Sequence, residues 1–239
     1  MRIADSRILI VGGSSGMGFA LARSCLGAGA AVTAVGRDPG KLALARDRLP
    51  GLATIAADIT DEGQVAALFG RSGPLDHIVT TAADIEGAYR LLPELEIAAA
   101  QRVVASKFLG PLMLAKYGAP VLAPGGSITV TSGIAAYRPA PRGSVVAAIN
   151  AALEGLVRAL AVELAPIRVN AVSPGWVDTP VWKSVAGDAK DEMLAGMARR
   201  LPVGRTGEPE EIADAIAFLM GNGFVTGEVL HVEGGHRLI

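Results

Sequence analysis

The chain has 239 residues, of which 51% are hydrophobic and 19% charged, and its formal net charge at pH 7 is −1. This length and hydrophobic content predict a single domain over residues 1–239, and the scattered Lys and Arg argue against nucleic acid as a partner. Three widely separated histidines predict no metal site, and a lone cysteine is consistent with a reducing cytoplasm. The apolar runs contain charges such as Glu154 and Arg158, which predicts core helices and not membrane spans, and the first residues do not resemble a signal peptide.

Short β-rich runs alternate with Ala-rich stretches along the whole chain. The β-rich runs predict strands over residues 7–11, 31–35, 52–57, 75–81, 127–132, 167–173 and 229–233. The stretches between them have apolar residues at helical intervals and predict helices over residues 16–26, 41–49, 62–69, 94–119, 144–164 and 208–220. This alternation predicts an α/β fold, a Rossmann-like doubly wound seven-stranded parallel sheet with helices on both faces. Ligands of such sheets bind beyond the carboxyl ends of the strands.

A glycine-rich segment joins the first predicted strand to the first predicted helix. Its glycines allow a tight turn that brings backbone N–H groups and the helix dipole against a pyrophosphate. A flexible turn is the alternative, but the strand before and the helix after favour a dinucleotide site. The residues expected to bind the cofactor there are Gly12, Ser14, Ser15, Gly16, Met17 and Gly18.

The end of the second predicted strand bears on the choice of cofactor. An acidic residue at this position binds the ribose hydroxyls of NAD and repels a 2′-phosphate. Gly36 stands there instead, and the guanidinium of Arg37 can pair with the phosphate of NADP. The sequence therefore favours NADP(H), with an exposed loop arginine as the alternative role for Arg37.

The spacing Gly12-x-x-x-Gly16-x-Gly18 resembles the short-chain dehydrogenase/reductase family. Further blocks that resemble this family lie at residues 57–60, 168–175, 201–205, 208–213, 225–227 and 233–235, so the resemblance covers nearly the whole chain. It implies additional cofactor contacts at Asp58, Ile59, Ala82, Pro174, Gly175, Val177 and Thr179.

The same resemblance implies hydride transfer with an Asn-Ser-Tyr-Lys set, in which serine steadies the carbonyl, tyrosine moves the proton, and lysine lowers the tyrosine pKa. Ser132, at the end of the fifth predicted strand, matches the serine. Aligning the next helix places Val146 at the tyrosine position and Asn150 at the lysine position. No other register restores the pair, because the residues four positions after the three tyrosines are Pro93, Val121 and Pro141.

Lys107 lies in a segment that resembles the one carrying the family's asparagine, so lysine and asparagine have exchanged places between Lys107 and Asn150. In the family these two positions converge beneath the nicotinamide ribose. We therefore expect Lys107 to deliver its ammonium to that spot, with Asn150 as its partner and Ser132 as the third catalytic residue. A surface lysine that extends into solvent is the alternative.

Residues 177–201 correspond to the family's variable substrate loop. Trp182 in this loop, with Met193 and Met197, predicts an adaptable apolar lid, and Tyr137 is expected to line the substrate pocket. Relatives in the family pair through the helices predicted at residues 94–119 and 144–164, so we expect a homodimer or a two-fold symmetric homotetramer.

Two interpretations of the function stay open. The first is an atypical NADP(H)-dependent oxidoreductase, a carbonyl reductase acting on a small molecule, in which the proton comes from Lys107, water or the substrate. The second is a dinucleotide-binding protein without hydride transfer, acting as a sensor, a partner subunit, or an isomerase or lyase that uses the same cleft. An intact cofactor loop beside an altered catalytic pair agrees with both interpretations.

Overall fold

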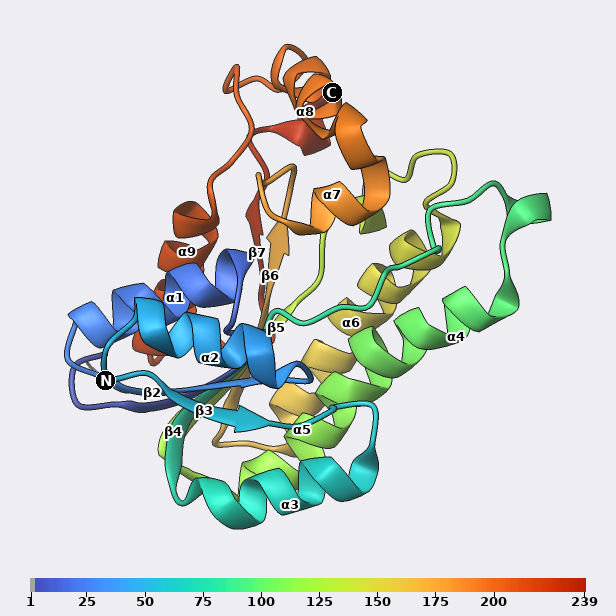
Figure 1. The fold of residues 1–239 in the computed structure, drawn as a ribbon. Helices are drawn as coiled ribbons and strands as arrows, with labels where there is room; N and C mark the ends of the chain where they lie inside the picture. Colours follow the sequence, from blue (N-terminus) through green and yellow to red (C-terminus); the bar gives the residue numbers. More distant parts are fainter. Residues whose placement is uncertain (1–2) are drawn as a thin grey trace.

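Seven parallel strands form one sheet in the computed structural model, which describes residues 3–239 (Figure 1). The strand order is β3-β2-β1-β4-β5-β6-β7, so the direction of winding reverses between β1 and β4. The predicted α/β doubly wound sheet is confirmed. The strands are β1 Arg7–Val11, β2 Ala31–Gly36, β3 Ala53–Ala56, β4 Leu75–Thr80, β5 Leu122–Thr131, β6 Arg168–Pro174 and β7 Val229–Val232.

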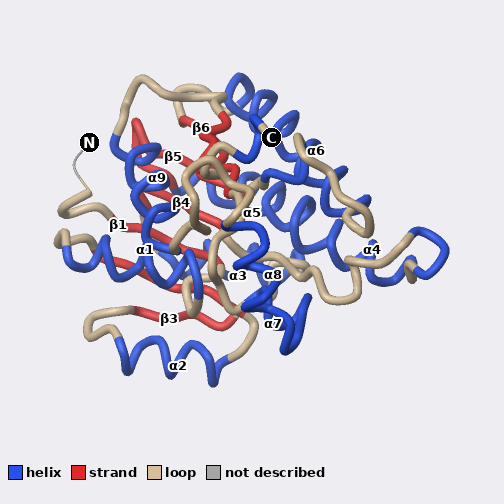
Figure 2. Tube along the Cα trace, turned by 90° about the horizontal axis from the view of Figure 1, so that it is seen from above, coloured by secondary structure: helices blue, strands red, loops and turns tan. Residues whose placement is uncertain are grey.

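Helices cover both faces of the sheet, and Figure 2 shows the strands enclosed between them. Their bounds are α1 Gly16–Gly27, α2 Pro39–Arg48, α3 Glu62–Ser72, α4 Ile97–Val104, α5 Gly110–Gly118, α6 Ser144–Glu163, α7 Val181–Ala186, α8 Lys190–Ala198 and α9 Pro209–Gly221. Helices α1, α2 and α9 contribute to the core on one face, and α3, α5 and α6 to the core on the other.

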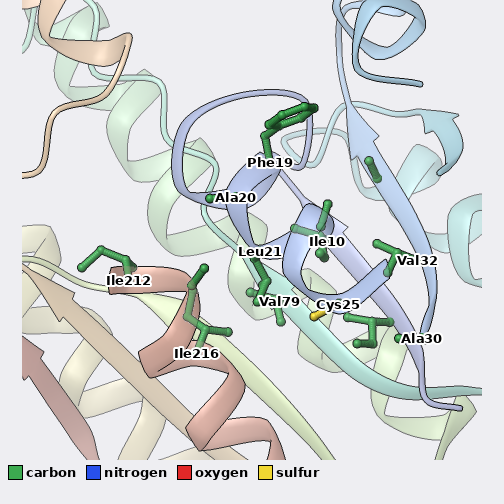
Figure 3. Packing of buried hydrophobic residues seen from close by; sticks show 14 of the residues in the cluster. Ile10, Phe19, Ala20, Leu21, Cys25, Ala30, Val32, Val79, Ile212 and Ile216 are labelled. Carbon is green, nitrogen blue, oxygen red and sulfur yellow. The ribbon is translucent and has the colours of Figure 1, made fainter. Parts of the chain in front are cut away.

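Alternating side chains of each strand supply the two cores, because successive residues of a strand point to opposite faces of the sheet. On β1, Ile8 and Ile10 join the core beneath α1 and α9, whereas Leu9 and Val11 join the core beneath α3, α5 and α6. Figure 3 shows Ile10 in the first of these layers. Both faces are buried, which explains why the strands are nearly continuous hydrophobic runs.

The helix predicted over residues 94–119 is not one regular helix. A short 3₁₀ turn, Leu92–Glu94, precedes α4, and a wider π-helical turn, Ala105–Leu109, separates α4 from α5. Pro111 provides the physical reason, because it lacks a backbone N–H and its ring clashes with the carbonyl four residues earlier, that of Lys107. The wider turn therefore occurs in the segment that carries Lys107.

Two further helices replace the loop expected at residues 177–201. Helices α7 and α8 lie beyond the end of β6 in Figure 1, joined by the short 3₁₀ turn Gly187–Ala189. Sequence periodicity did not predict them because they are short and their polar and apolar residues are mixed. Residues of α7 form part of the wall of the cleft at the carboxyl end of the sheet.

Helix α6 is long and apolar enough to span a membrane by length and composition alone. It packs on β6 in the core of the domain, and its inner face includes the polar residues Asn150 and Glu154. This placement is that of a core helix, as the sequence predicted.

Candidate cofactor and active site

A cleft of about 560 Å³ lies beyond the carboxyl ends of the strands, and the segments that follow β1 to β6 all contribute to its lining. Parallel strands bring these ends to one edge of the sheet, so residues from distant parts of the chain meet there. The predicted cofactor residues that line the cleft are Gly12, Ser14, Ser15, Gly16, Met17, Arg37, Asp58, Ile59, Ala82, Pro174, Gly175, Val177 and Thr179.

The glycine loop forms a cradle that side chains would fill. Gly12 has a φ of +85°, and a Cβ on it would lie 2.9 Å from the backbone N of Ala82. Gly18 does not line the cleft; a Cβ there would lie 2.4 Å from the carbonyl oxygen of Gly12, so this residue allows α1 to pack against the loop. Ser15 begins α1 without a side-chain cap, which leaves the first N–H groups of the helix open to an anion. The loop therefore fits the pyrophosphate of a dinucleotide.

A carboxylate that the sequence did not predict lies at the end of β2. Asp84, in the loop after β4, places Oδ2 3.1 Å from Nη1 of Arg37, and both residues line the cleft. The Asp84 side chain is 15% exposed, and its backbone N–H donates to Ser106 Oγ at 2.9 Å. Gly36 itself carries no carboxylate, but tertiary packing brings that of Asp84 to Arg37 from the loop after β4.

Lys107 is buried in the wall of the cleft, on the π-helical turn. Its Nζ donates to the carbonyl oxygens of Thr131 at 3.0 Å and Ser132 at 2.9 Å. Burial lowers the pKa of Lys107 to about 8. The lysine therefore faces the end of β5 and does not extend into solvent.

Val146 and Asn150 lie one turn apart on α6, and both line the cleft. Asn150 Nδ2 donates to the carbonyl oxygen of Gly133 at 3.3 Å, while its buried Oδ1 has no hydrogen-bond partner within residues 3–239. No direct hydrogen bond joins Asn150 to Lys107 in the described chain. The two side chains instead hold neighbouring carbonyl groups of the segment that ends β5.

Ser132 lines the cleft and forms hydrogen bonds with α6. Its Oγ lies 3.1 Å from the carbonyl oxygen of Asn150 and 3.2 Å from Oε1 of Glu154. The other carboxylate oxygen of Glu154 accepts from the Tyr137 hydroxyl at 2.6 Å. Sequence reasoning noted Glu154 only as a charge that interrupts an apolar run. A signal was present, because Val146, Asn150 and Glu154 follow one another at intervals of four residues on one face of the helix.

Trp182 and Tyr137, the two residues expected to contact the substrate, differ in their position relative to the cleft. Trp182 of α7 lines the cleft, where its Nε1 donates to the Val177 carbonyl at 2.7 Å and its ring stacks on Trp176 with centroids 4.7 Å apart. Tyr137 is not among the lining residues, because its hydroxyl is directed to Glu154 and its ring packs edge-on against His231. The role of Tyr137 toward a substrate therefore stays a prediction.

The other two tyrosines differ in their relation to the cleft. Tyr117 donates its hydroxyl to Glu62 at 2.8 Å and does not line the cleft. Tyr89 lines it and packs beside Val146, and burial raises its pKa. In the described part of the chain no three His, Cys, Asp or Glu side chains gather as a possible metal site.

Comparison with known proteins agrees with this geometry. Residues 11–237 match the family model described as enoyl-(acyl carrier protein) reductase. Cis-4-hydroxycyclohexanecarboxylate dehydrogenase of Sinomonas cyclohexanicum is 37% identical over 99% of this chain and 98% of its own. Short-chain dehydrogenase/reductase malC of Malbranchea aurantiaca is 34% identical over 99% of this chain and 96% of its own.

Solved structures are also similar over nearly the full length. The structure described as MalC reductase/Diels-Alderase has a TM-score of 0.91 at 33% identity and covers 99% of this chain and 98% of its own. A small-chain dehydrogenase in complex with NADPH has a TM-score of 0.86 at 35% identity and covers 98% and 100%. The chain therefore belongs to the short-chain dehydrogenase/reductase family of oxidoreductases, whose cofactor is a nicotinamide dinucleotide.

Proposed function

We propose that the protein is an NADP(H)-dependent oxidoreductase that interconverts a carbonyl and an alcohol on a small molecule, and that its acid–base group is not the family's Tyr-x-x-x-Lys pair. The observation that carries this proposal is that the glycine cradle and Ser132 line one cleft. A dinucleotide held at the cradle shares that cleft with a substrate beside Ser132. Trp182 and the rest of α7 form the wall opposite the sheet.

The chemistry of the residues that line the cleft indicates which of them bind NADP(H). The open N–H groups at the start of α1 bind the pyrophosphate, and Asp58 contacts the adenine. Arg37 and Lys41 line the cleft beyond β2 and pair with the 2′-phosphate. A relative solved with NADPH supports this assignment. When bound, the nicotinamide donates or accepts the hydride.

Lys107 acts on the site in two ways. Two of its three N–H donors hold the carbonyl groups of Thr131 and Ser132, which positions Ser132, and the third is available to a ribose hydroxyl. Val146 and Asn150 stand where the family has its tyrosine and lysine, so α6 offers no phenol at that place. Asn150 holds the Gly133 carbonyl and keeps its Oδ1 free for water or substrate.

A second candidate is use of the cleft without hydride transfer. It is favoured by the altered pair on α6 and by the description of the MalC structure as both a reductase and a Diels-Alderase. In this case the dinucleotide shapes the cleft and the bound substrate reacts by rearrangement or elimination.

Cofactor titration and turnover distinguish the two candidates. NADPH and NADH binding is measured by fluorescence, and absorbance of the reduced nicotinamide is followed with NADP⁺ and cis-4-hydroxycyclohexanecarboxylate, other secondary alcohols, or NADPH and carbonyl compounds. Hydride transfer predicts tight NADPH binding and turnover of at least one probe. Tight binding with no turnover supports the second candidate, and absence of binding contradicts both.

We further propose a cytoplasmic homodimer or homotetramer. Ile97 of α4, Leu112 of α5 and Val162 of α6 are exposed apolar residues on the helices through which family members pair. Size-exclusion chromatography with light scattering measures the assembly, and a monomer at micromolar concentration would contradict it. Cell fractionation tests the location.

A further inference from the structure

Glu154 is a buried carboxyl group that the proposed function does not yet use. The residue is 7% exposed and lies on α6, two turns beyond Val146. Both of its oxygens accept from neutral hydroxyls: Oε2 from Tyr137 at 2.6 Å and Oε1 from Ser132 at 3.2 Å. No Lys or Arg forms an ion pair with it among residues 3–239. Burying a carboxylate without a cation is costly, so hydrophobic packing does not account for its presence.

The hydrogen bonds of Ser132 determine what this residue offers to a ligand. A hydroxyl has one hydrogen, and the Ser132 Oγ lies near two protein acceptors, Glu154 Oε1 and the Asn150 carbonyl oxygen. The hydrogen is therefore directed to α6, and the oxygen lone pair is what remains for the cleft. A substrate hydroxyl can donate to this lone pair. A substrate carbonyl needs a donor, so a protonated Glu154 must first donate to Ser132 Oγ and leave the Ser132 hydrogen to point into the cleft.

We propose that Glu154, acting through the catalytic residue Ser132, accepts and returns the proton of the reaction in place of the missing tyrosine and lysine. This inference rests on the proposed oxidoreductase function. Glu154 is connected to the cleft by one hydrogen bond, and its other oxygen is connected to Tyr137, which is 43% exposed. The carboxyl group thus lies between the reacting site and the protein surface.

In the oxidation direction the steps balance as follows. The substrate O–H proton passes to Ser132 Oγ as the Ser132 hydrogen passes to Glu154 Oε1, so Glu154 becomes a neutral acid. The C–H bond breaks with its electron pair, which leaves as hydride to the oxidised nicotinamide, and the substrate becomes a carbonyl compound. After the product leaves, Glu154 returns its proton to Ser132 as the Ser132 hydrogen passes to water in the open cleft. Reduction is the reverse, with Glu154 supplying through Ser132 the proton that the new alcohol receives.

The titratable side chains next to Glu154, Tyr137 and His231, are less suited than Glu154 to accept the proton. Burial and the hydrogen bond to Glu154 raise the pKa of Tyr137 to about 12, so the phenol stays protonated. Burial and Arg237 lower the pKa of His231, whose ring packs against Tyr137, and this disfavours a charged imidazolium beside the phenol. The charged and titratable groups facing this cluster are Lys107 beyond Ser132, Arg158 of α6, Glu228, Glu233, and Arg237, which is paired with Glu233.

Replacing Glu154 by Gln removes the acid–base function but keeps the side-chain size. For the probe alcohol that the wild type oxidises, Glu154→Gln should lower kcat by at least about 100-fold, the usual contribution of acid–base catalysis. The dissociation constant for NADPH should stay within about two-fold, because Glu154 does not line the cleft. The limb of the pH–rate profile that reports the base should disappear. Glu163→Gln is the matched control, since this exposed residue ends the same helix and should change nothing.

Tyr137→Phe provides a second variant that keeps the carboxyl group. The Ser132–Glu154 hydrogen bond does not involve Tyr137, so Tyr137→Phe should keep most of the wild-type kcat while Glu154→Gln loses it. A purely structural role for Glu154 would alter stability and leave the shape of the pH–rate profile unchanged in Glu154→Gln. Circular dichroism and thermal unfolding monitor folding of both variants.

The outcomes separate this inference from the proposed function. An active wild type whose kcat and pH–rate profile persist in Glu154→Gln, or whose Tyr137→Phe variant loses as much kcat as Glu154→Gln, overturns the role of Glu154 alone. A wild type that binds NADPH but turns over none of the probes overturns the oxidoreductase function and this inference with it.

Discussion

Asp84 Oδ2 lies 3.1 Å from Nη1 of Arg37, so a carboxylate from the loop after β4 neutralises the cation that follows β2. An acidic group at the 2′ position of the adenine ribose disfavours a phosphate and accepts from ribose hydroxyls. We therefore expect this pair, which joins residues that follow two different strands, to influence the choice between NADP(H) and NAD(H).

Asp84→Asn should raise the preference for NADPH over NADH, because Arg37 is then free to pair with the phosphate. Arg37→Ala should remove most of the preference, by about 1–3 kcal/mol for a charged hydrogen bond. Fluorescence titration of both cofactors measures the two variants. Glu86→Gln removes a nearby exposed charge outside the cleft lining and should leave the ratio unchanged. Equal affinity of the wild type for NADPH and NADH would refute the assignment.

Lys107→Met should weaken NADPH binding and lower turnover together. The variant loses the two hydrogen bonds to the carbonyl groups of Thr131 and Ser132 and the positive charge within the cleft wall. Lys116→Met is the matched control on the neighbouring helix, since Lys116 is exposed and pairs with Glu62 at 2.7 Å. If both variants bind NADPH as the wild type does, Lys107 has no role in the cofactor site.

Lys107 should also give the protein a pH-dependent stability. Its pKa falls from 10.5 to about 8 on burial, so between these values the unfolded chain binds more protons than the folded protein. The free energy of unfolding should therefore rise with pH across this window, by on the order of 3 kcal/mol at about 1.4 kcal/mol per pH unit. Urea unfolding of the wild type and Lys107→Met at several pH values measures the difference. A difference that does not change with pH would show that Lys107 titrates normally.

Val146→Tyr alone should not create an efficient family-type reductase, because a phenol titrates near pH 10 and needs a neighbouring cation to donate well at neutral pH. Adding Asn150→Lys should increase turnover more than additively. Adding Lys107→Asn as well should increase it further, because it removes a second ammonium from the same group of carbonyls. Turnover of one probe by the single, double and triple variants measures the coupling. If the single variant equals the double, the two positions act independently.

Local patterns account for what was predicted correctly. Hydrophobic runs and helical periodicity depend on neighbouring residues, so the parallel sheet followed from the sequence. The π-helical turn at Lys107 also has a local cause, Pro111. Hydrophobic periodicity does not reveal this effect of proline. Helices α7 and α8 had no clear periodic signal and depend on packing over the sheet.

By itself the sequence determined the fold and the glycine cradle, because each is a matter of residue type and spacing along the chain. Only the tertiary structure decided what these residues meet. Arg37 and Asp84 are separated by 47 residues and meet because β2 and β4 end at one edge of the sheet. Ser132 and Glu154 are separated by 22 residues and meet because α6 packs against the segment that follows β5. Glu154, a charged residue within an apolar stretch of the sequence, thereby becomes the hydrogen-bond partner of Ser132. The packing of α6, and not the local sequence, directs Glu154 to Ser132.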